Sequence, residues 1–332
     1  MEEVSQAEPT RVGAGPPPQR YCCGLFGGAA VNNYDFENGP DADFHADSLI
    51  KLTHGITAYR IVEPKNIDSR PIAEVPIIVC LHGMYNSSFM WADIADLLTD
   101  FEQGPQARVL VLDFYGHGRS PWTGVDITLD TLVTQIKELM DFLELTRTHK
   151  PAAFVGFDLG GAVAAGFAAK FPNYCSSLSL ISPVGYKFRT VPKKNKLKKI
   201  LPQLQESAFY DKSEDSPHRY LVDRAMGMVR WQLQHTPGYF GAIESTIKHF
   251  PITGMEELFT AIGRHPRPTL NVWGNRDNVC NYKRCMQLTE ESFPKGNIVD
   301  IADCGHDAPF EKFEDVVKEL LTFHLTIFNE LK

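Results

Sequence analysis

The chain has 332 residues, of which 43% are apolar and 22% charged, and its formal net charge is −8. This apolar content suffices for a full hydrophobic core, and the acidic balance argues against nucleic acid as a partner. Seven scattered cysteines without a CxxC pair fit a reduced compartment. The start, Met1-Glu2-Glu3, lacks the basic and apolar regions of a secretory signal. We therefore expect a soluble, cytoplasmic protein.

The first residues of the chain predict a tail without structure. Residues 1–20 include three consecutive prolines and few large apolar groups, which is typical of a disordered segment. Cys22 and Cys23 follow, beside Leu25 and Phe26. Two unmodified thiols are the favoured interpretation of this pair, and an acylated, weak membrane contact is the alternative.

Short apolar runs recur further along the chain and predict strands that are covered on both faces. Helical patterns separate these runs, and strand–helix alternation of this kind indicates an α/β fold with a mostly parallel, doubly wound sheet. The predicted strands begin at Leu49 and continue at 76–81, 108–113, 153–155, 178–181, 269–273 and 298–301. The predicted helices cover 91–98, 131–145, 161–170 and 314–331.

The alternation breaks between residues 185 and 267. This stretch is polar, helix-prone and interrupted by several prolines, and it contains no clear apolar strand. It predicts a helical cap inserted over the carboxyl edge of the sheet, where such sheets bind ligands. The core domain is then formed by residues 21–184 and 268–332.

The most informative motif lies between Phe154 and Gly161, which reads Phe-Val-Gly-Phe-Asp-Leu-Gly-Gly. Glycines on either side of a nucleophile, after an apolar run and before a helix of small residues, mark a strand that turns sharply into a helix. The side chain exposed at this turn is Asp158. Because an aspartate is already ionised, it is suited to attack a saturated carbon and form an alkyl ester on the enzyme.

Two later loops supply the partners that such a nucleophile needs. Asp277 follows the strand that ends near Trp273, and His306 lies in a glycine-containing loop after the strand that ends at Ile301. The chain order is nucleophile, acid, histidine, which is the order expected for the α/β-hydrolase fold. Each motif is modest by itself, and together they predict an Asp158–His306–Asp277 triad.

On these residues the chain resembles the α/β-hydrolases from about Ile50 to the C-terminus, as it does at His82-Gly83 and at 113–120. The resemblance implies an oxyanion hole formed by the backbone N–H groups of Leu159 and Met84. It implies no cofactor, and the dispersed histidines indicate no metal site.

An aspartate nucleophile makes this triad similar to that of soluble epoxide hydrolases and haloalkane dehalogenases. The implied reaction has two halves. Asp158 attacks carbon and becomes an ester, and His306, oriented by Asp277, then activates the water that hydrolyses this ester. We expect a small, largely apolar substrate beneath the cap.

Other positions depart from the epoxide hydrolase pattern. Tyr85 stands where those enzymes usually have proline, and Leu159 where they usually have tryptophan. A tyrosine of the cap would have to donate a proton to the epoxide oxygen. The candidates for this role are Tyr186, Tyr210, Tyr220 and Tyr239.

The surroundings of the elbow resemble the serine-dependent ester and lipid hydrolases instead. One alternative is therefore a carboxylic-ester or lipid hydrolase in which Asp158 has replaced the serine, as a natural or an introduced change. The other is a non-catalytic, ligand-binding pseudoenzyme. A lysine-rich stretch that includes Lys193–Lys199 is best interpreted as a solvated helix face, with contact to an anionic membrane surface as the alternative.

Overall fold

A computed structural model of the chain contains one eight-stranded sheet with the order β1-β2-β4-β3-β5-β6-β7-β8. The structure describes residues 48–64, 71–100, 104–145, 150–186, 201, 203, 205–211, 213–216 and 219–330. The strands are β1 (Ser48–Leu52), β2 (Gly55–Val62), β3 (Ile77–Leu81), β4 (Arg108–Leu112), β5 (Ala152–Phe157), β6 (Cys175–Ile181), β7 (Thr269–Gly274) and β8 (Asn297–Ile301). Strands β1 and β2 pair antiparallel, and the sheet is parallel from β4 to β8. The prediction of a mostly parallel, doubly wound sheet is confirmed.

The central strands are apolar because both of their faces are covered. Every residue of β3, β4 and β5 is buried, and Val79 pairs with Leu110 on one side and Phe154 on the other. Branched and aromatic side chains suit such a doubly covered position. Since these strands run parallel, their carboxyl ends meet at one edge of the sheet, and the loops that follow them are neighbours.

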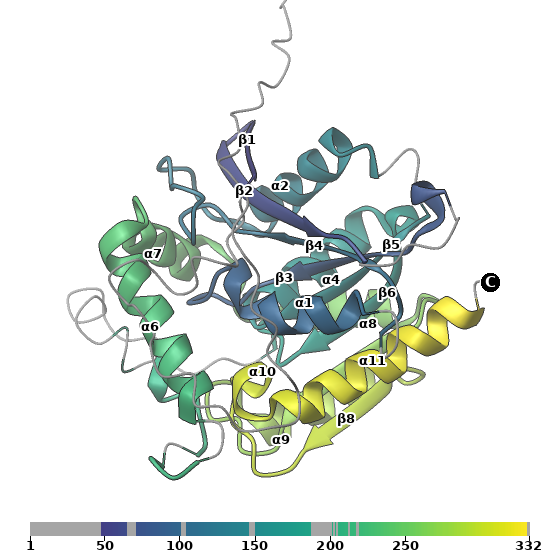
Figure 1. The fold of residues 1–332 in the computed structure, drawn as a ribbon. Helices are drawn as coiled ribbons and strands as arrows, with labels where there is room; N and C mark the ends of the chain where they lie inside the picture. Colours follow the sequence, from purple (N-terminus) through teal and green to yellow (C-terminus); the bar gives the residue numbers. More distant parts are fainter. Residues whose placement is uncertain are drawn as a thin grey trace, which may run out of the picture.

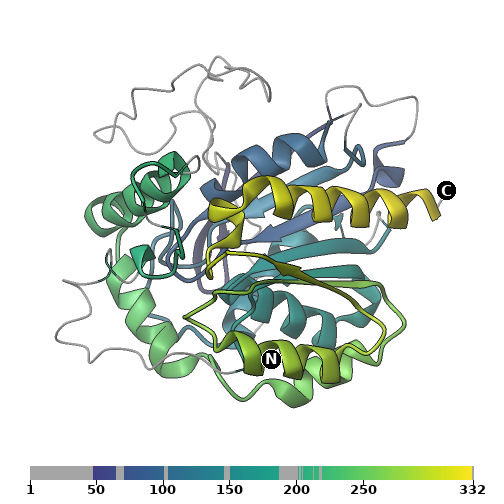
Figure 2. The ribbon, with the colours of Figure 1, turned by 90° about the horizontal axis from the view of Figure 1, so that it is seen from below.

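Helices cover the sheet from both sides, as Figures 1 and 2 show. One face carries α1 (Ala92–Leu98) and α11 (Phe313–Glu330), and these two helices share a hydrophobic core with the sheet. The other face carries α2 (Leu129–Phe142), α4 (Leu159–Lys170), α8 (Glu256–Gly263) and α9 (Tyr282–Ser292), which enclose a second core. Short 3-10 turns occur at Ile72–Glu74, Ser88–Trp91 and Pro172–Tyr174.

Helices α6 (Arg219–His235) and α7 (Tyr239–His249) lie together at one end of the sheet (Figure 1). Hydrogen bonds attach α6 to loops that follow the carboxyl ends of β3 and β4. The Gln232 side chain accepts from the Gly118 N–H at 2.8 Å and donates to the Tyr85 carbonyl at 3.0 Å. Helix α8 instead packs against α4 and α9 on a face of the sheet. The limits of the cap, at 185 and 267, stay a prediction.

Several sequence expectations concern residues that the structure does not describe. The tail at 1–20, Cys22 and Cys23, and the stretch Lys193–Lys199 all lie outside the described residues. Among the helices of the described ranges, none has the length and apolar character needed to cross a lipid bilayer.

Candidate active site

Asp158 stands at the sharp turn between β5 and α4. Its backbone has φ 51° and ψ −115°, a strained conformation for a residue with a side chain. The two neighbouring glycines allow the turn. A Cβ atom on Gly156 would lie 2.3 Å from the Gly160 carbonyl oxygen, and one on Gly160 would lie 2.1 Å from the Leu81 carbonyl oxygen. The turn therefore presents Asp158 at the carboxyl edge of the sheet, between β3 and β6.

The backbone N–H of Met84 donates to Asp158 Oδ2 at 2.7 Å. Met84 belongs to the loop after β3, and two histidines fix this loop. His82 accepts from the Phe114 N–H through Nε2 at 3.0 Å, and His117 Nε2 lies 2.7 Å from the Met84 carbonyl oxygen. Burial lowers the pKa of both imidazoles, so both are neutral and structural. One expected oxyanion donor, Met84, is thus occupied by the carboxylate itself.

Leu159, the other expected oxyanion donor, is the first residue of α4. The N–H groups of the first helical turn have no partner within the helix, so they are available to a ligand. No hydrogen bond of the Leu159 N–H occurs within the described residues. Both donors therefore flank Asp158, with one engaged and one available.

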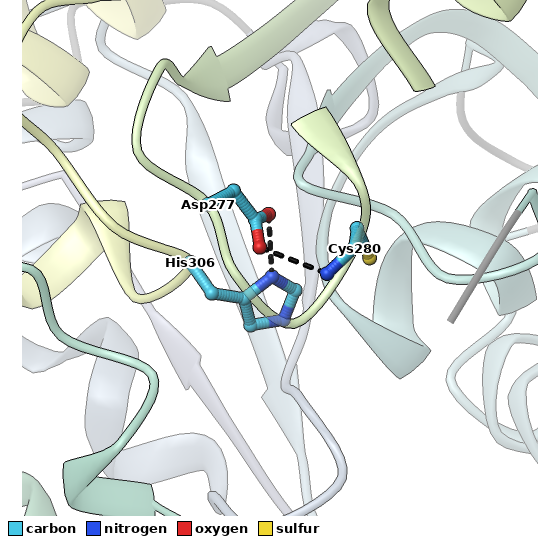
Figure 3. Close-up of side chains that lie close together, drawn as sticks. All are labelled: Asp277, Cys280 and His306. Carbon is cyan, nitrogen blue, oxygen red and sulfur yellow. Dashed lines mark hydrogen bonds and ion pairs between the residues drawn. The ribbon is translucent and has the colours of Figure 1, made fainter. Parts of the chain in front are cut away.

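The structure brings Asp158, His306 and Asp277 together although up to 148 positions separate them. His306 Nε2 lies 3.3 Å from Asp158 Oδ1, and His306 Nδ1 lies 2.8 Å from Asp277 Oδ2. Figure 3 shows the Asp277 carboxylate between the His306 ring and the Cys280 backbone. The other oxygen, Asp277 Oδ1, accepts the N–H groups of Val279 and Cys280 at 2.8 and 2.9 Å. Asp277 is thus held in place while it orients the imidazole.

The two carboxylates decide the charge of the imidazole. Burial by itself lowers the pKa of His306, but the negative charges and hydrogen bonds of Asp277 and Asp158 outweigh burial and hold this pKa well above its ordinary value. His306 is therefore an imidazolium between two carboxylates. It becomes a base only when one of those negative charges is removed.

Residues that the sequence analysis did not single out hold the His306 loop. The His306 N–H donates to the Ala208 carbonyl at 2.8 Å, and the Gly305 N–H donates to Glu311 Oε2 at 2.7 Å. The buried Glu311 carboxylate, in the short helix α10 (Ala308–Glu311), also accepts the N–H groups of Tyr210 and Asp211. The segment at 208–211 is thereby tied to the loop that carries His306. The only sequence signal for this role was an acidic residue shortly after His306.

The four candidate tyrosines lie in different surroundings. Tyr186 is buried and stacks on Phe259 with ring centroids 4.4 Å apart, and Tyr239 donates its hydroxyl to the Tyr85 carbonyl at 2.9 Å. Tyr210 and Tyr220 are 49% and 58% exposed. Among the described residues, no hydrogen bond of the Tyr186, Tyr210 or Tyr239 hydroxyl group to Asp158 or His306 occurs.

Two residues that the sequence analysis did not single out for the site lie near the triad. The negative charges of Asp158 and Asp307 add to burial in raising the pKa of the Tyr85 phenol. Asp307 directly follows His306 and is 2% exposed. Tyr85 lies in the loop after His82-Gly83 and Asp307 directly follows His306, but the electrostatic contact of both side chains with the triad is seen only in the folded chain.

Within the described part of the chain, Asp277, Cys280 and His306 form a group whose residue types could hold a metal. One ligand atom from each lies within 4.8 Å of the others, and all three residues are buried. However, Asp277 and His306 already bond to each other at 2.8 Å (Figure 3). A side-chain hydrogen bond with Cys285 and burial raise the pKa of the Cys280 thiol, so it is not poised as a thiolate ligand. The arrangement fits a proton relay better than a metal site.

Comparisons with known proteins identify the fold family of the chain. Residues 76–313 match the family model described as the alpha/beta hydrolase fold. Monoacylglycerol lipase ABHD6 of Bos taurus is 26% identical over 275 residues, which cover 76% of this chain and 77% of the relative. Lipase 3 of Moraxella sp. (strain TA144) is 25% identical over 272 residues, which cover 79% of each chain.

Solved structures show the same fold. Carboxylesterase CesB (YbfK) from Bacillus subtilis superimposes with a TM-score of 0.65 at 19% identity, covering 83% of this chain and 90% of the other. A meta-cleavage product hydrolase from Pseudomonas fluorescens IP01 gives 0.62 at 19% identity, covering 86% and 98%. The family match spans well over half of the residues, and its relatives named here are hydrolases. The chain belongs to the α/β-hydrolase fold family.

Proposed function

We propose that the protein is a hydrolase of the carboxylic-ester and lipid class in which Asp158 stands in the place of the serine nucleophile. One observation carries this proposal. The relay that such a hydrolase needs is complete, since buried His306 bonds Asp277 at 2.8 Å and turns Nε2 toward residue 158. Lipases among the relatives support the substrate class. Only the nucleophile departs from the pattern of a serine hydrolase.

Asp158 itself limits ester cleavage in the native chain. Its Oδ2 accepts the Met84 N–H at 2.7 Å, which is a donor that the oxyanion of an ester substrate would need. Attack of a carboxylate on an ester also has to form an anhydride while it expels an alkoxide, which is an unfavourable exchange. We therefore expect slow ester hydrolysis by the native protein.

The exchange Asp158→Ser tests this proposal. A serine restores a nucleophile that His306 can deprotonate, and it releases the Met84 N–H. Ester turnover, measured with a medium-chain monoacylglycerol and an aryl butyrate, should rise by at least about 100-fold, the usual effect of one oxyanion donor. The double variant Asp158→Ser, His306→Ala is the control and should lose the gain. If the serine variant gains no ester turnover, the proposal is wrong.

A second candidate reaction is hydrolysis at a saturated carbon, such as the opening of an epoxide on an apolar substrate. The carboxylate of Asp158 favours it, because Met84 holds Oδ2 while Oδ1 faces the His306 ring at 3.3 Å. In this reaction Asp158 Oδ1 forms a bond to carbon as the carbon–oxygen bond of the ring breaks.

The charges of the site suit the second half of that reaction. Alkylation makes Asp158 neutral and removes one of the two negative charges that hold the pKa of His306 up. His306 then gives its proton to the alkoxide that ring opening leaves, and becomes neutral. It accepts a proton from water, and the hydroxide attacks the carbonyl carbon of the Asp158 ester. The bond between this carbon and the substrate oxygen then breaks, and the diol leaves with the proton held by His306. The Met84 N–H, already beside Oδ2, stabilises the oxyanion of this step.

A single turnover in ¹⁸O-labelled water tests the second candidate reaction. With an aryl epoxide and excess protein, attack by Asp158 should place the label in the peptide that contains Asp158, read by mass spectrometry. Water attacking the epoxide directly would leave this peptide unlabelled and would eliminate the second candidate. The first proposal does not depend on this outcome.

A further inference from the structure

A second buried carboxyl group lies beside the catalytic histidine. Asp307 is 2% exposed, and its Oδ2 accepts the side-chain N–H of Gln205 at 2.7 Å. Gln205 is itself 2% exposed and lies in the segment that carries the Ala208 contact to His306. Within the described residues, Asp307 Oδ1 has no hydrogen-bond partner. One oxygen is therefore anchored, and the other is available.

The charges around Asp307 favour its neutral form. Its direct partner, Gln205, is an uncharged amide that brings no compensating charge. Burial, together with the negative charges of Asp158, Glu311 and Asp277, raises the pKa of Asp307 to about 8, although the positive charge of His306 opposes this shift. Two carboxylates already share the single positive charge of His306, so a further negative charge at Asp307 is unfavourable and Asp307 keeps its proton.

We propose that Asp307 is a substrate-binding residue, a carboxylic acid that donates a hydrogen bond from Oδ1 to an uncharged oxygen of the substrate. The identity of the substrate rests on the proposed function, and the presence of the acid does not.

The same charges select the kind of oxygen that binds. The site already holds the carboxylates of Asp158 and Asp277 around the single charge of His306. These negative charges would repel an anionic headgroup. Such a headgroup would also compete with Asp307 for the proton that Asp307 needs in order to donate a hydrogen bond. A hydroxyl, ether, ester or epoxide oxygen accepts a hydrogen bond without adding charge. The preferred substrate is therefore a lipid-like molecule with an uncharged oxygen-bearing head.

Infrared difference spectroscopy of the full-length native protein reads the acid directly. The spectrum of the native protein minus that of Asp307→Asn should contain the carbonyl band of a neutral carboxylic acid at pH 7. The band should disappear as the pH rises through about 8. Asp303→Asn is the matched control, because Asp303 is an exposed aspartate on the same loop, paired with Arg276, and should contribute no such band. If no Asp307-dependent band occurs at pH 7, the proposal is overturned.

Binding shows whether the acid contacts a ligand. Dodecyl glycerol ether is an uncharged, non-hydrolysable probe, and its affinity can be measured by calorimetry without turnover. Asp307→Ala should weaken its binding about five- to tenfold, the usual value of one hydrogen bond, and Asp307→Asn should restore most of this loss because the amide also donates. Equal binding by the native protein and the alanine variant would refute contact with the ligand.

The pH dependence of binding separates a ligand contact from a structural role. In the native protein, affinity for the ether should fall above about pH 8, and in Asp307→Asn it should not. Both measurements use the native residue at 158. If the Asp158→Ser variant gains no ester turnover, the proposed function fails while the band and the binding data still decide the role of Asp307.

Discussion

His324 offers a quantitative test of how this fold responds to acid. It lies in α11 and is 0% exposed, with the rings of Phe323 and Phe328 at centroid distances of 5.4 and 5.7 Å. Neither ring nitrogen has a hydrogen-bond partner among the described residues. Burial lowers the pKa of His324 from 6.5 to about 3. The folded protein therefore keeps this imidazole neutral where the unfolded chain protonates it.

The sign of the effect follows from proton binding. Between pH 6.5 and pH 3 the unfolded state binds a proton at His324 that the folded state does not, so stability falls as the pH drops below 6.5. One pKa unit corresponds to about 1.4 kcal/mol, so the loss at pH 5 is about 2 kcal/mol relative to pH 8. His324→Leu removes this loss. It also removes two unsatisfied nitrogens, which should stabilise the protein by about 1 kcal/mol even at pH 8.

Urea unfolding followed by tryptophan fluorescence measures both effects. The free-energy difference between His324→Leu and the native protein should grow by about 2 kcal/mol from pH 8 to pH 5. Subtracting the native curve cancels the contributions of His82 and His117, which are also buried and neutral. His235→Leu, at the exposed end of α6, is the control for replacing a histidine by leucine outside the core. Parallel curves for His324→Leu and the native protein would refute the reasoning.

Two further substitutions test the supports of the site. Gly160→Ala places a Cβ atom 2.1 Å from the Leu81 carbonyl oxygen, and only backbone movement relieves this clash. The variant should lose more than about 3 kcal/mol of unfolding free energy, measured by thermal unfolding. An unchanged melting temperature would contradict this. In Glu311→Gln, the side-chain NH2 group faces backbone N–H groups that need an acceptor. The free energy of unfolding should therefore fall by about 1–3 kcal/mol. The substitution should also speed hydrogen exchange at Gly305 without changing exchange in α2, and equal exchange at Gly305 would contradict the role given to Glu311.

The parts of the fold that depend on local pattern could be predicted from the sequence. The apolar runs at 76–81 and 108–113 correspond to β3 (Ile77–Leu81) and β4 (Arg108–Leu112), because a strand covered on both faces has no polar side to interrupt its pattern. The order of Asp158, Asp277 and His306 along the chain was informative for a related reason. Each residue follows a parallel strand, and parallel strands end at one edge. Topology then brings the three residues together.

The rest of the site depends on tertiary contacts that leave no periodic signal. Gln205 and Asp307 are 102 positions apart, and nothing in the spacing of either predicts their hydrogen bond. Glu311 likewise acts through backbone N–H groups, whose positions depend on the fold and not on side-chain type. The same is true of the candidate tyrosines. The sequence offered four tyrosine hydroxyl groups as candidates. Only the folded structure showed that the Tyr239 hydroxyl donates to the Tyr85 carbonyl.

Asp158, His306 and Asp307 form one electrostatic unit, and this links the two candidate reactions. The negative charge of Asp158 helps to hold the pKa of both His306 and Asp307 up. Alkylation of Asp158 and the exchange Asp158→Ser both remove that charge, so each should lower both pKa values in the same direction. His306 then becomes a base at a lower pH, as hydrolysis of an alkyl ester and activation of a serine both require. Ester cleavage in the serine variant and ester hydrolysis after alkylation thus depend on the same release of a proton from His306.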